Sequence, residues 1–344
     1  MPPAPNYLDP QTLAAIESVE LRARMVVEGL MTGRHRSPQQ GVSVEFAQHR
    51  PYAAGDDTRF LDWKVFGKTD KLYLKQYRQE TNLDLWLLLD ASGSMGYTSL
   101  TADRPGWTAR WTKWNHGCCV AAAMANVALR QQDRVGLTLF ADTPRGGCRL
   151  SNASHHWKTI AQELQQARPL SPTPDPAPTS PPQKNNPSTG LAGLAEGGGQ
   201  GGAGGTDVGG VLDRVMAQAA RRSLVVLISD LFEDPARLES GLARLHHRQH
   251  DAMVLQVMDP AELEFGFRDL SEFAGLEGEG RLPVDPPALR RAYREVVDQH
   301  LRAVQAVARK FDYDYALLRT DQALGPPLSA FLARRAAMIS KGAG

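Results

Sequence analysis

The chain has 344 residues, with 39 Lys and Arg against 38 Asp and Glu. This length suits one large or two modest domains, and a balanced charge without a basic stripe argues against a nucleic-acid partner. The apolar runs are too short to cross a bilayer, and the first residues lack the features of a signal peptide. Three cysteines, two of them adjacent, do not indicate a disulfide framework. We therefore expect a cytoplasmic protein with reduced thiols.

Residues 1–80 are expected to form an N-terminal helical and β extension. A helix is predicted over residues 9–33, because Asp9 can cap it and apolar residues then recur at roughly helical spacing. Two segments of alternating polarity, residues 42–46 and 71–75, predict half-exposed strands.

Between these two strands, a turn signal is followed by charge and a large aromatic side chain. The residues concerned are Asp56, Asp57, Arg59 and Trp63. Their spacing alone favours a surface turn with a local ion pair, which contributes little to stability. The alternative is an interaction surface packed against the main domain.

Residues 85–97, LWLLLDASGSMGY, are the most informative stretch. A short apolar run closed by Gly and Ser predicts a strand buried on both faces, as in a parallel sheet. Such sheets place functional residues just beyond the carboxyl ends of their strands, here Asp90, Ser92 and Ser94. One carboxylate and two hydroxyls suit Mg²⁺ or another hard divalent cation. The alternative is an ordinary turn in which Ser92 or Ser94 caps the next helix.

The following segment, residues 97–114, is polar and rich in Trp, which predicts a loop at the same edge as Asp90. Trp107, Trp111 and Trp114 look exposed in it and are candidates for contact with a partner, since Trp is enriched at interface hot spots. The alternative is that they cover the sheet edge as part of the core.

Strands and helices then alternate along the chain. Buried strands are predicted at residues 133–142, 223–230, 251–258 and 313–319, and helices at 115–131, 154–168, 234–249, 286–310 and 328–338. This alternation predicts a doubly wound, mostly parallel α/β sheet over residues 81–340.

Residues 169–205 interrupt the pattern with a Pro-rich run followed by a Gly-rich run. This composition cannot bury a core, so a disordered or polyproline-like insert is expected. Thr206 then lies near the start of a helix, and Asp230 ends its strand much as Asp90 does. These strand ends and the helix start can converge at one edge of the sheet.

Asp90-x-Ser92-x-Ser94, followed by Thr206 and Asp230, resembles the metal-ion-dependent adhesion site of von Willebrand factor A (vWA) domains, with every part in the family's order. The resemblance implies that these five residues surround Mg²⁺, or another divalent cation such as Mn²⁺ or Ca²⁺, partly through water. The insert before Thr206 departs from the family pattern, and a displaced Thr206 would leave the site incomplete.

The stretch from Tyr52 to Trp63 resembles the signature of a bacterial family, domain-of-unknown-function fifty-eight. Members of that family resemble partners of MoxR-type AAA+ ATPases. The resemblance makes Asp56, Asp57, Arg59 and Trp63 a family hallmark and candidate partner-binding residues.

Together the resemblances imply a non-enzymatic, metal-dependent protein-binding module, monomeric by itself. It would serve as an adaptor for a MoxR-type ATPase in assembly or maturation of a client, and a Glu or Asp of the partner would complete the metal's coordination. Two alternatives stay open: a Mg²⁺-dependent hydrolase or phosphatase, and a scaffold with a vestigial metal site. The first is disfavoured because no Lys or His lies around Asp90 in the sequence and residue 92 is Ser instead of a second Asp.

Overall fold

The computed structural model describes residues 9–34, 49–51, 65–67, 71–75, 83–170, 208–217, 219, 222–267, 271–274, 281–284 and 286–342. Several sequence predictions lie outside these residues. They are the strand at 42–46, the residues Asp56, Asp57, Arg59 and Trp63, the site residue Thr206, and the insert from residue 171 onward.

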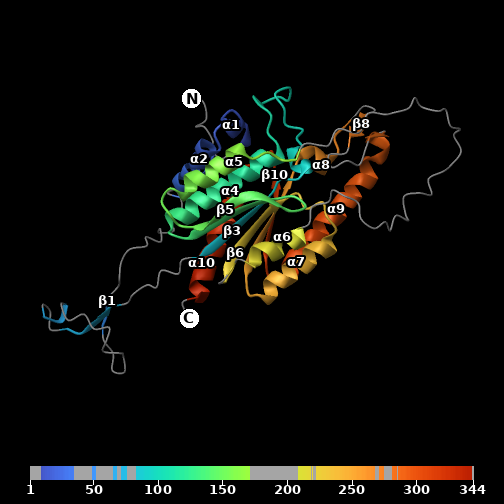
Figure 1. Cartoon of the computed structure of the whole chain (residues 1–344). Helices are drawn as coiled ribbons and strands as arrows, with labels where there is room; N and C mark the ends of the chain where they lie inside the picture. The colour runs from blue at the N-terminus through green and yellow to red at the C-terminus, as the bar shows by residue number, and fades with distance from the viewer. Residues whose placement is uncertain are drawn as a thin grey trace, which may run out of the picture.

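Six strands form the main sheet in the order β10-β7-β6-β3-β4-β5 (Figure 1). Five of them run parallel: β3 (Asp84–Asp90), β4 (Arg134–Phe140), β6 (Ser223–Ser229), β7 (Asp251–Met258) and β10 (Asp314–Arg319). The prediction of a doubly wound, mostly parallel α/β sheet is therefore confirmed.

The sixth strand, β5 (Pro144–Ser151), was not predicted, and it pairs antiparallel with β4 at the edge of the sheet. Its residues are mostly exposed and polar or glycine, so they give no period-two apolar signal. Gly147 in this strand has a φ of +136°, and a Cβ there would lie 2.0 Å from the Leu137 carbonyl oxygen. Only glycine therefore fits this position in the pairing of β5 with β4.

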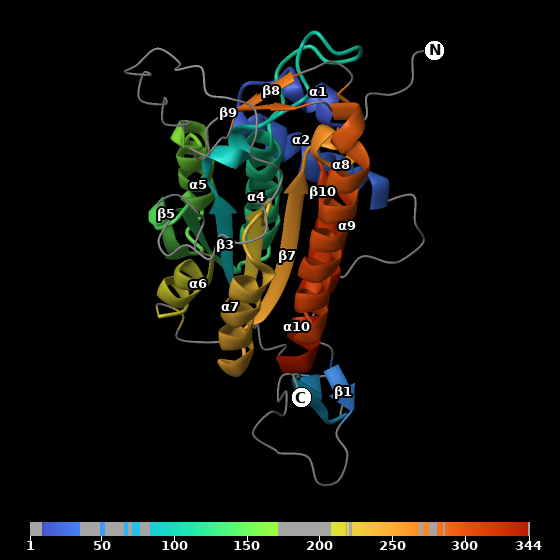
Figure 2. The same cartoon turned by 90° about the vertical axis from the view of Figure 1, so that its right-hand side faces the viewer.

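Helices cover both faces of the sheet (Figure 2). One face carries α2 (Val19–Arg34), α4 (Lys113–Arg130), α5 (His156–Gln166) and α10 (Gly325–Gly342), and the other carries α6 (Val208–Met216), α7 (Pro235–His247) and α9 (Pro286–Lys310). Among the described residues, no helix is both long and apolar enough to cross a membrane.

The central strand β3 supplies apolar side chains to both layers, as a strand buried on both faces should. Leu85, Leu87 and Leu89 belong to the core under α4, whereas Trp86 and Leu88 belong to the core under α6 and α7. Every side chain of β3 is buried. The predicted buried strand at Leu85–Asp90 is thus confirmed.

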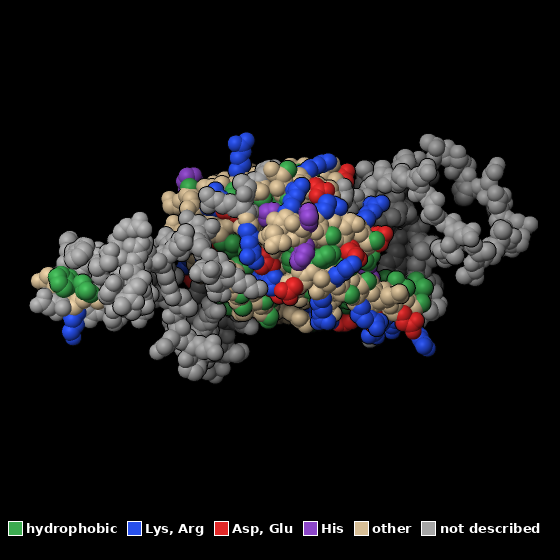
Figure 3. All heavy atoms as spheres, turned by 90° about the horizontal axis from the view of Figure 1, so that it is seen from below, with side chains coloured by type: hydrophobic (Ala, Val, Ile, Leu, Met, Phe, Trp, Pro, Cys, Tyr) green, Lys and Arg blue, Asp and Glu red, His purple; other side chains and the backbone are tan. Residues whose placement is uncertain are grey.

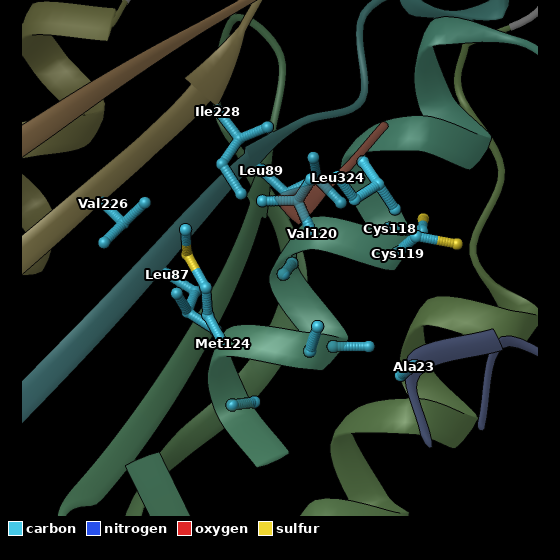
Figure 4. Close-up of a cluster of buried hydrophobic side chains, with 14 of the residues drawn as sticks. Ala23, Leu87, Leu89, Cys118, Cys119, Val120, Met124, Val226, Ile228 and Leu324 are labelled. Atoms are coloured by element: carbon cyan, nitrogen blue, oxygen red, sulfur yellow. The ribbon is translucent and has the colours of Figure 1, made fainter. Parts of the chain in front are cut away.

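Helix α4 packs closely on the sheet because it presents small side chains (Figure 4). A Cβ on Gly117 would lie 2.8 Å from Leu89 Cδ1 and 3.4 Å from Ile228 Cγ2. Cys118 and Cys119 are buried in the same layer, and burial raises the pKa of the Cys119 thiol to about 12. Both cysteines are core residues, as expected.

The predicted helix at residues 9–33 is broken into α1 (Pro10–Ala14) and α2. Ser18 Oγ accepts a hydrogen bond from Leu21 N at 3.3 Å, and Arg22 Nε donates to the carbonyl oxygens of Leu13 at 3.1 Å and of Ile16. These side chains satisfy the groups left unpaired at the break. Helix α2 shares the core of α4 and α5, while the division of the chain at residue 80 stays a prediction.

Two small antiparallel sheets are present besides the main sheet. They consist of β1 (His49–Pro51) with β2 (Tyr73–Lys75), and of β8 (Ser271–Ala274) with β9 (Arg281–Val284). On the face seen in Figure 3, basic and acidic side chains are interspersed without a large patch of one sign, in line with the balanced charge.

Candidate functional site

Asp90 is the last residue of β3, and Asp230 comes directly after the neighbouring strand β6. The chain connections of the sheet run in opposite directions from these two strands. Leu89 pairs with Ile228 near the ends of β3 and β6, so both carboxylates come at the same edge. From β3 the chain proceeds to β4 on one side, whereas β6 leads to β7 on the other. In sheets of this class, the crevice between two such strand ends is where ligands bind.

Asp90 is completely buried. Its Oδ1 accepts a hydrogen bond from Ser92 N at 2.8 Å, and its Oδ2 accepts one from Ser229 Oγ. Burial and the negative charge of Asp230 raise the pKa of the Asp90 carboxyl to about 7, although the two hydrogen bonds oppose this shift. A cation beside Asp90 would favour the ionised carboxylate.

The hydroxyls of Ser92 and Ser94 lie together in the loop after Asp90. Ser92 precedes the 3₁₀ turn η2 (Gly93–Gly96), but its side chain makes no capping hydrogen bond. Its Oγ is instead 3.0 Å from Ser94 Oγ. The alternative role for Ser92, helix capping, is therefore not seen.

The beginning of the predicted insert lies against this loop. Leu170 N donates a hydrogen bond to the carbonyl oxygen of Ala91 at 2.9 Å, and a Cβ on Gly96 would lie 3.5 Å from Pro169. Pro169 and Leu170 are thus in contact with the loop. The prediction that the insert is disordered from residue 169 onward is therefore wrong for these two residues.

A buried lysine occupies the same edge of the sheet. Lys113 is fully buried, and its Nζ donates to Asp230 Oδ2 at 2.8 Å and to Glu262 Oε1 at 2.6 Å. Burial alone would lower the pKa of Lys113, but the two carboxylates outweigh it and raise that pKa. Lys113 is the first residue of α4, where a cation is disfavoured by the helix dipole, so its position depends on these carboxylates.

Glu262 is held in place by the start of α8 (Pro260–Glu264). Its Oε2 accepts a hydrogen bond from Asp259 N at 2.8 Å, as part of a capping box. The carboxylate of Asp259 in turn accepts hydrogen bonds from Ser99 N at 2.9 Å and from Ser99 Oγ. The loop after η2 is therefore tied to α8, which holds the partner of Lys113.

The three tryptophans of residues 107–114, two in that loop and one at the start of α4, do not form an exposed surface. Trp107, Trp111 and Trp114 are 6%, 0% and 5% exposed, so the expectation that they face solvent is wrong and the alternative, that they are core, is confirmed. Trp111 N donates to the carbonyl oxygen of Leu100 at 2.9 Å, and the Arg22 guanidinium lies 5.0 Å from the Trp111 ring centroid. The loop folds back on itself and under α2, which sequence polarity did not reveal.

Phe232 is an exposed aromatic side chain beside the site. It is 48% exposed, its ring centroid lies 5.1 Å from Lys113 Nζ, and it stacks on His300 with 6.1 Å between ring centroids.

Sequence reasoning missed Lys113, Glu262 and Phe232. The sequence predicted that the helix begins at residue 115, so Lys113 was assigned to the preceding loop, whereas α4 begins at Lys113. No sequence signal connects the other two residues with Asp230.

The predicted metal ligands therefore differ in how far the structure supports them as a single site. Asp90, Ser92 and Ser94 offer hard oxygen atoms in one short loop and fit a divalent cation chemically. Asp230 is engaged by Lys113, and Thr206 lies outside the described residues. In the part of the chain that the structure describes, no group of three or more His, Cys, Asp or Glu side chains is arranged to hold a metal ion.

The fold and the site define an α/β protein with a polar site at the carboxyl edge of its sheet. The chain belongs to the family "Protein of unknown function DUF58", whose model matches residues 48–303. The prediction of this family is confirmed.

Individual relatives and solved structures share only a small part of their sequence with this chain. "Uncharacterized protein Mb1516" of Mycobacterium bovis is 24% identical over 95% of this chain and 90% of its own length. BatB of Bacteroides thetaiotaomicron is 13% identical over 75% of this chain and 99% of its own, with a TM-score of 0.41. The SpRpn10 VWA domain is 11% identical over 71% of this chain and 93% of its own, with a TM-score of 0.35.

Proposed function

We propose that this protein is a non-enzymatic, metal-dependent protein-binding module. Mg²⁺, Mn²⁺ or Ca²⁺ would be held by Asp90, Ser92 and Ser94, with Thr206 and Asp230 completing the set as in the vWA resemblance. A MoxR-type AAA+ ATPase or its client would supply a further carboxylate. When bound, the cation would supply an open coordination position at the edge of the sheet.

The observation that carries this proposal is the loop after β3. It follows a fully buried carboxylate whose pKa is raised, and the Ser92 and Ser94 hydroxyls lie 3.0 Å apart beside it. The loop lies at the topological switch between β3 and β6.

Metal binding is tested by thermal and chemical unfolding with and without Mg²⁺ or Mn²⁺. At about one hundred times the dissociation constant, the ion should add roughly 2.7 kcal/mol to the free energy of unfolding. Asp90→Ala should abolish this increase. Asp213→Ala is the control, because Asp213 forms only an exposed ion pair with Arg244. An ion effect that is equal in all three proteins would contradict a site at Asp90.

Partner binding is tested by pull-down of a MoxR-type ATPase with and without EDTA. Chelation, Asp90→Ala and Thr206→Ala should each weaken capture, while circular dichroism stays unchanged. Phe232→Ala should weaken it too, because this exposed ring offers apolar contact area beside the site. Capture that survives chelation and both ligand substitutions would move the interface elsewhere, with Asp56, Asp57, Arg59 and Trp63 next to be tested.

The hydrolase alternative gains one observation, because Lys113 lies beside Asp230 although sequence reasoning saw no Lys near Asp90. Its ammonium group is fully buried and donates to two carboxylates, so it is not presented to a substrate phosphate. We therefore keep the binding module. Turnover of generic phosphoesters with Mg²⁺, lost in Asp90→Ala, would favour the hydrolase.

A further inference from the structure

The polar edge of the sheet contains a cation supplied by the chain itself. Lys113 Nζ lies 2.8 Å from Asp230 Oδ2, on the carboxylate that the vWA resemblance assigns to the metal. The side chain of Lys113 is 0% exposed and that of Asp230 is 4% exposed, so water does not screen this pair.

Lys113 also has a second partner available. Glu262 Oε1 is 2.6 Å from the same Nζ, and Glu262 is anchored through its other oxygen by Asp259 N. The ammonium group can therefore give up its bond to Asp230 and remain paired with Glu262. Without this second carboxylate, a buried lysine that left Asp230 would have an unpaired positive charge.

The backbone keeps Lys113 directed at this edge. It lies one turn before Gly117 on α4, and Gly117 is pressed against Leu89 and Ile228, the residues that precede Asp90 by one position and Asp230 by two. Thr112 fixes the start of the helix, since its Oγ1 accepts a hydrogen bond from Asn115 N at 3.1 Å. The long side chain at the first helical position thus reaches the carboxyl ends of β3 and β6.

We infer that Lys113 competes with the divalent cation for Asp230, so that the ion binds only by transferring Lys113 to Glu262 alone. This inference rests on the proposed function and adds its regulation. Lys113 sets a weak and reversible metal affinity, because each binding event must displace a buried ion pair. Displacement also changes the surroundings of Phe232, whose ring lies 5.1 Å from Nζ. Ion binding is thereby coupled to the exposed aromatic side chain beside the site.

The decisive variant is Lys113→Met/Glu262→Gln, which removes one positive and one negative charge and so keeps the net charge of the site. Its matched control is Lys310→Met/Glu239→Gln, because that pair forms the same kind of ion pair on the surface. Affinity for Mn²⁺ alone is measured by electron paramagnetic resonance of the free ion. We expect about tenfold or more tighter binding in the first double variant, and no change in the control.

The outcomes separate this inference from the proposed function. Equal Mn²⁺ affinity in wild type and in Lys113→Met/Glu262→Gln overturns the inference alone. If Mn²⁺ binds to that variant but not to wild type, the inference is supported, and the proposed metal dependence of the natural chain is contradicted. No binding in either protein overturns both.

A measurement on the wild-type chain covers the case in which the double variant does not fold. The ¹⁵N-labelled ammonium resonance of Lys113, buried and hydrogen-bonded, is followed during titration with Mg²⁺. It should shift in step with saturation of the site, and Asp90→Ala should remove the shift. A resonance that stays fixed while Mg²⁺ saturates the site overturns the competition.

Discussion

The stability of this protein should fall in mild acid because of His116. The ring of His116 is buried in α4, and its Nδ1 accepts a hydrogen bond from Trp111 Nε1 at 3.4 Å. Burial lowers the pKa of His116 from 6.5 to about 4, although Asp321 opposes this shift. Below pH 6.5 the unfolded chain therefore binds a proton that the folded chain excludes, and the free energy of unfolding decreases as the pH falls towards 4.

The size of this effect follows from the shift. One pKa unit corresponds to about 1.4 kcal/mol, so His116 should remove roughly 2 kcal/mol of stability between about pH 7 and pH 5. Asp90, with its pKa raised to about 7, acts in the opposite sense over the same interval, since the folded chain takes up its proton first. The contribution of His116 must therefore be isolated by substitution.

The assay is urea unfolding at several pH values for wild type, His116→Gln and His247→Gln. His116→Gln retains an acceptor for Trp111 but has no proton to gain, so its stability should lose about 2 kcal/mol less than wild type between pH 7 and pH 5. His247 is exposed, and its variant should follow wild type. If the free energy of unfolding depended on pH equally in wild type and in His116→Gln, the reasoning would be refuted.

Three substitutions test the packing. Trp111→Ala should cost about 3–5 kcal/mol in urea unfolding, because this side chain is 0% exposed; a loss under 1 kcal/mol would contradict its place in the core. Arg335→Met should cost about 3 kcal/mol, because it leaves Asp133, whose side chain is 1% exposed, without that partner. In a double-mutant cycle, the stability losses from substituting Arg335 and Asp133 should be non-additive. Gly147→Ala should cost about 3 kcal/mol or more by thermal unfolding, whereas Gly266→Ala, with nothing within 4 Å, is the control.

Local pattern was sufficient where apolar residues form a continuous run or recur at helical spacing. The run Leu85–Leu89 is apolar at every position, and both layers of the core use it, so its strand was predictable. The long helix α9 was predicted at the bounds observed, Pro286–Lys310. The edge strand β5 was missed, because its residues are exposed and its pairing depends on a glycine conformation instead of a hydrophobic period.

The sequence by itself determined the fold class, the family resemblance and the position of Asp90, Ser92 and Ser94 after a buried strand, because those features depend on near neighbours in the chain. Only the tertiary structure decided which groups meet at that edge. Lys113 and Glu262 are far apart in sequence, and the pairing of β3, β6 and β7 brings both to Asp230. The tertiary structure also decided which side chains are buried. The polar sequence around Trp111 gave no sign that α2 and α4 enclose its ring, because this packing depends on elements distant in the sequence.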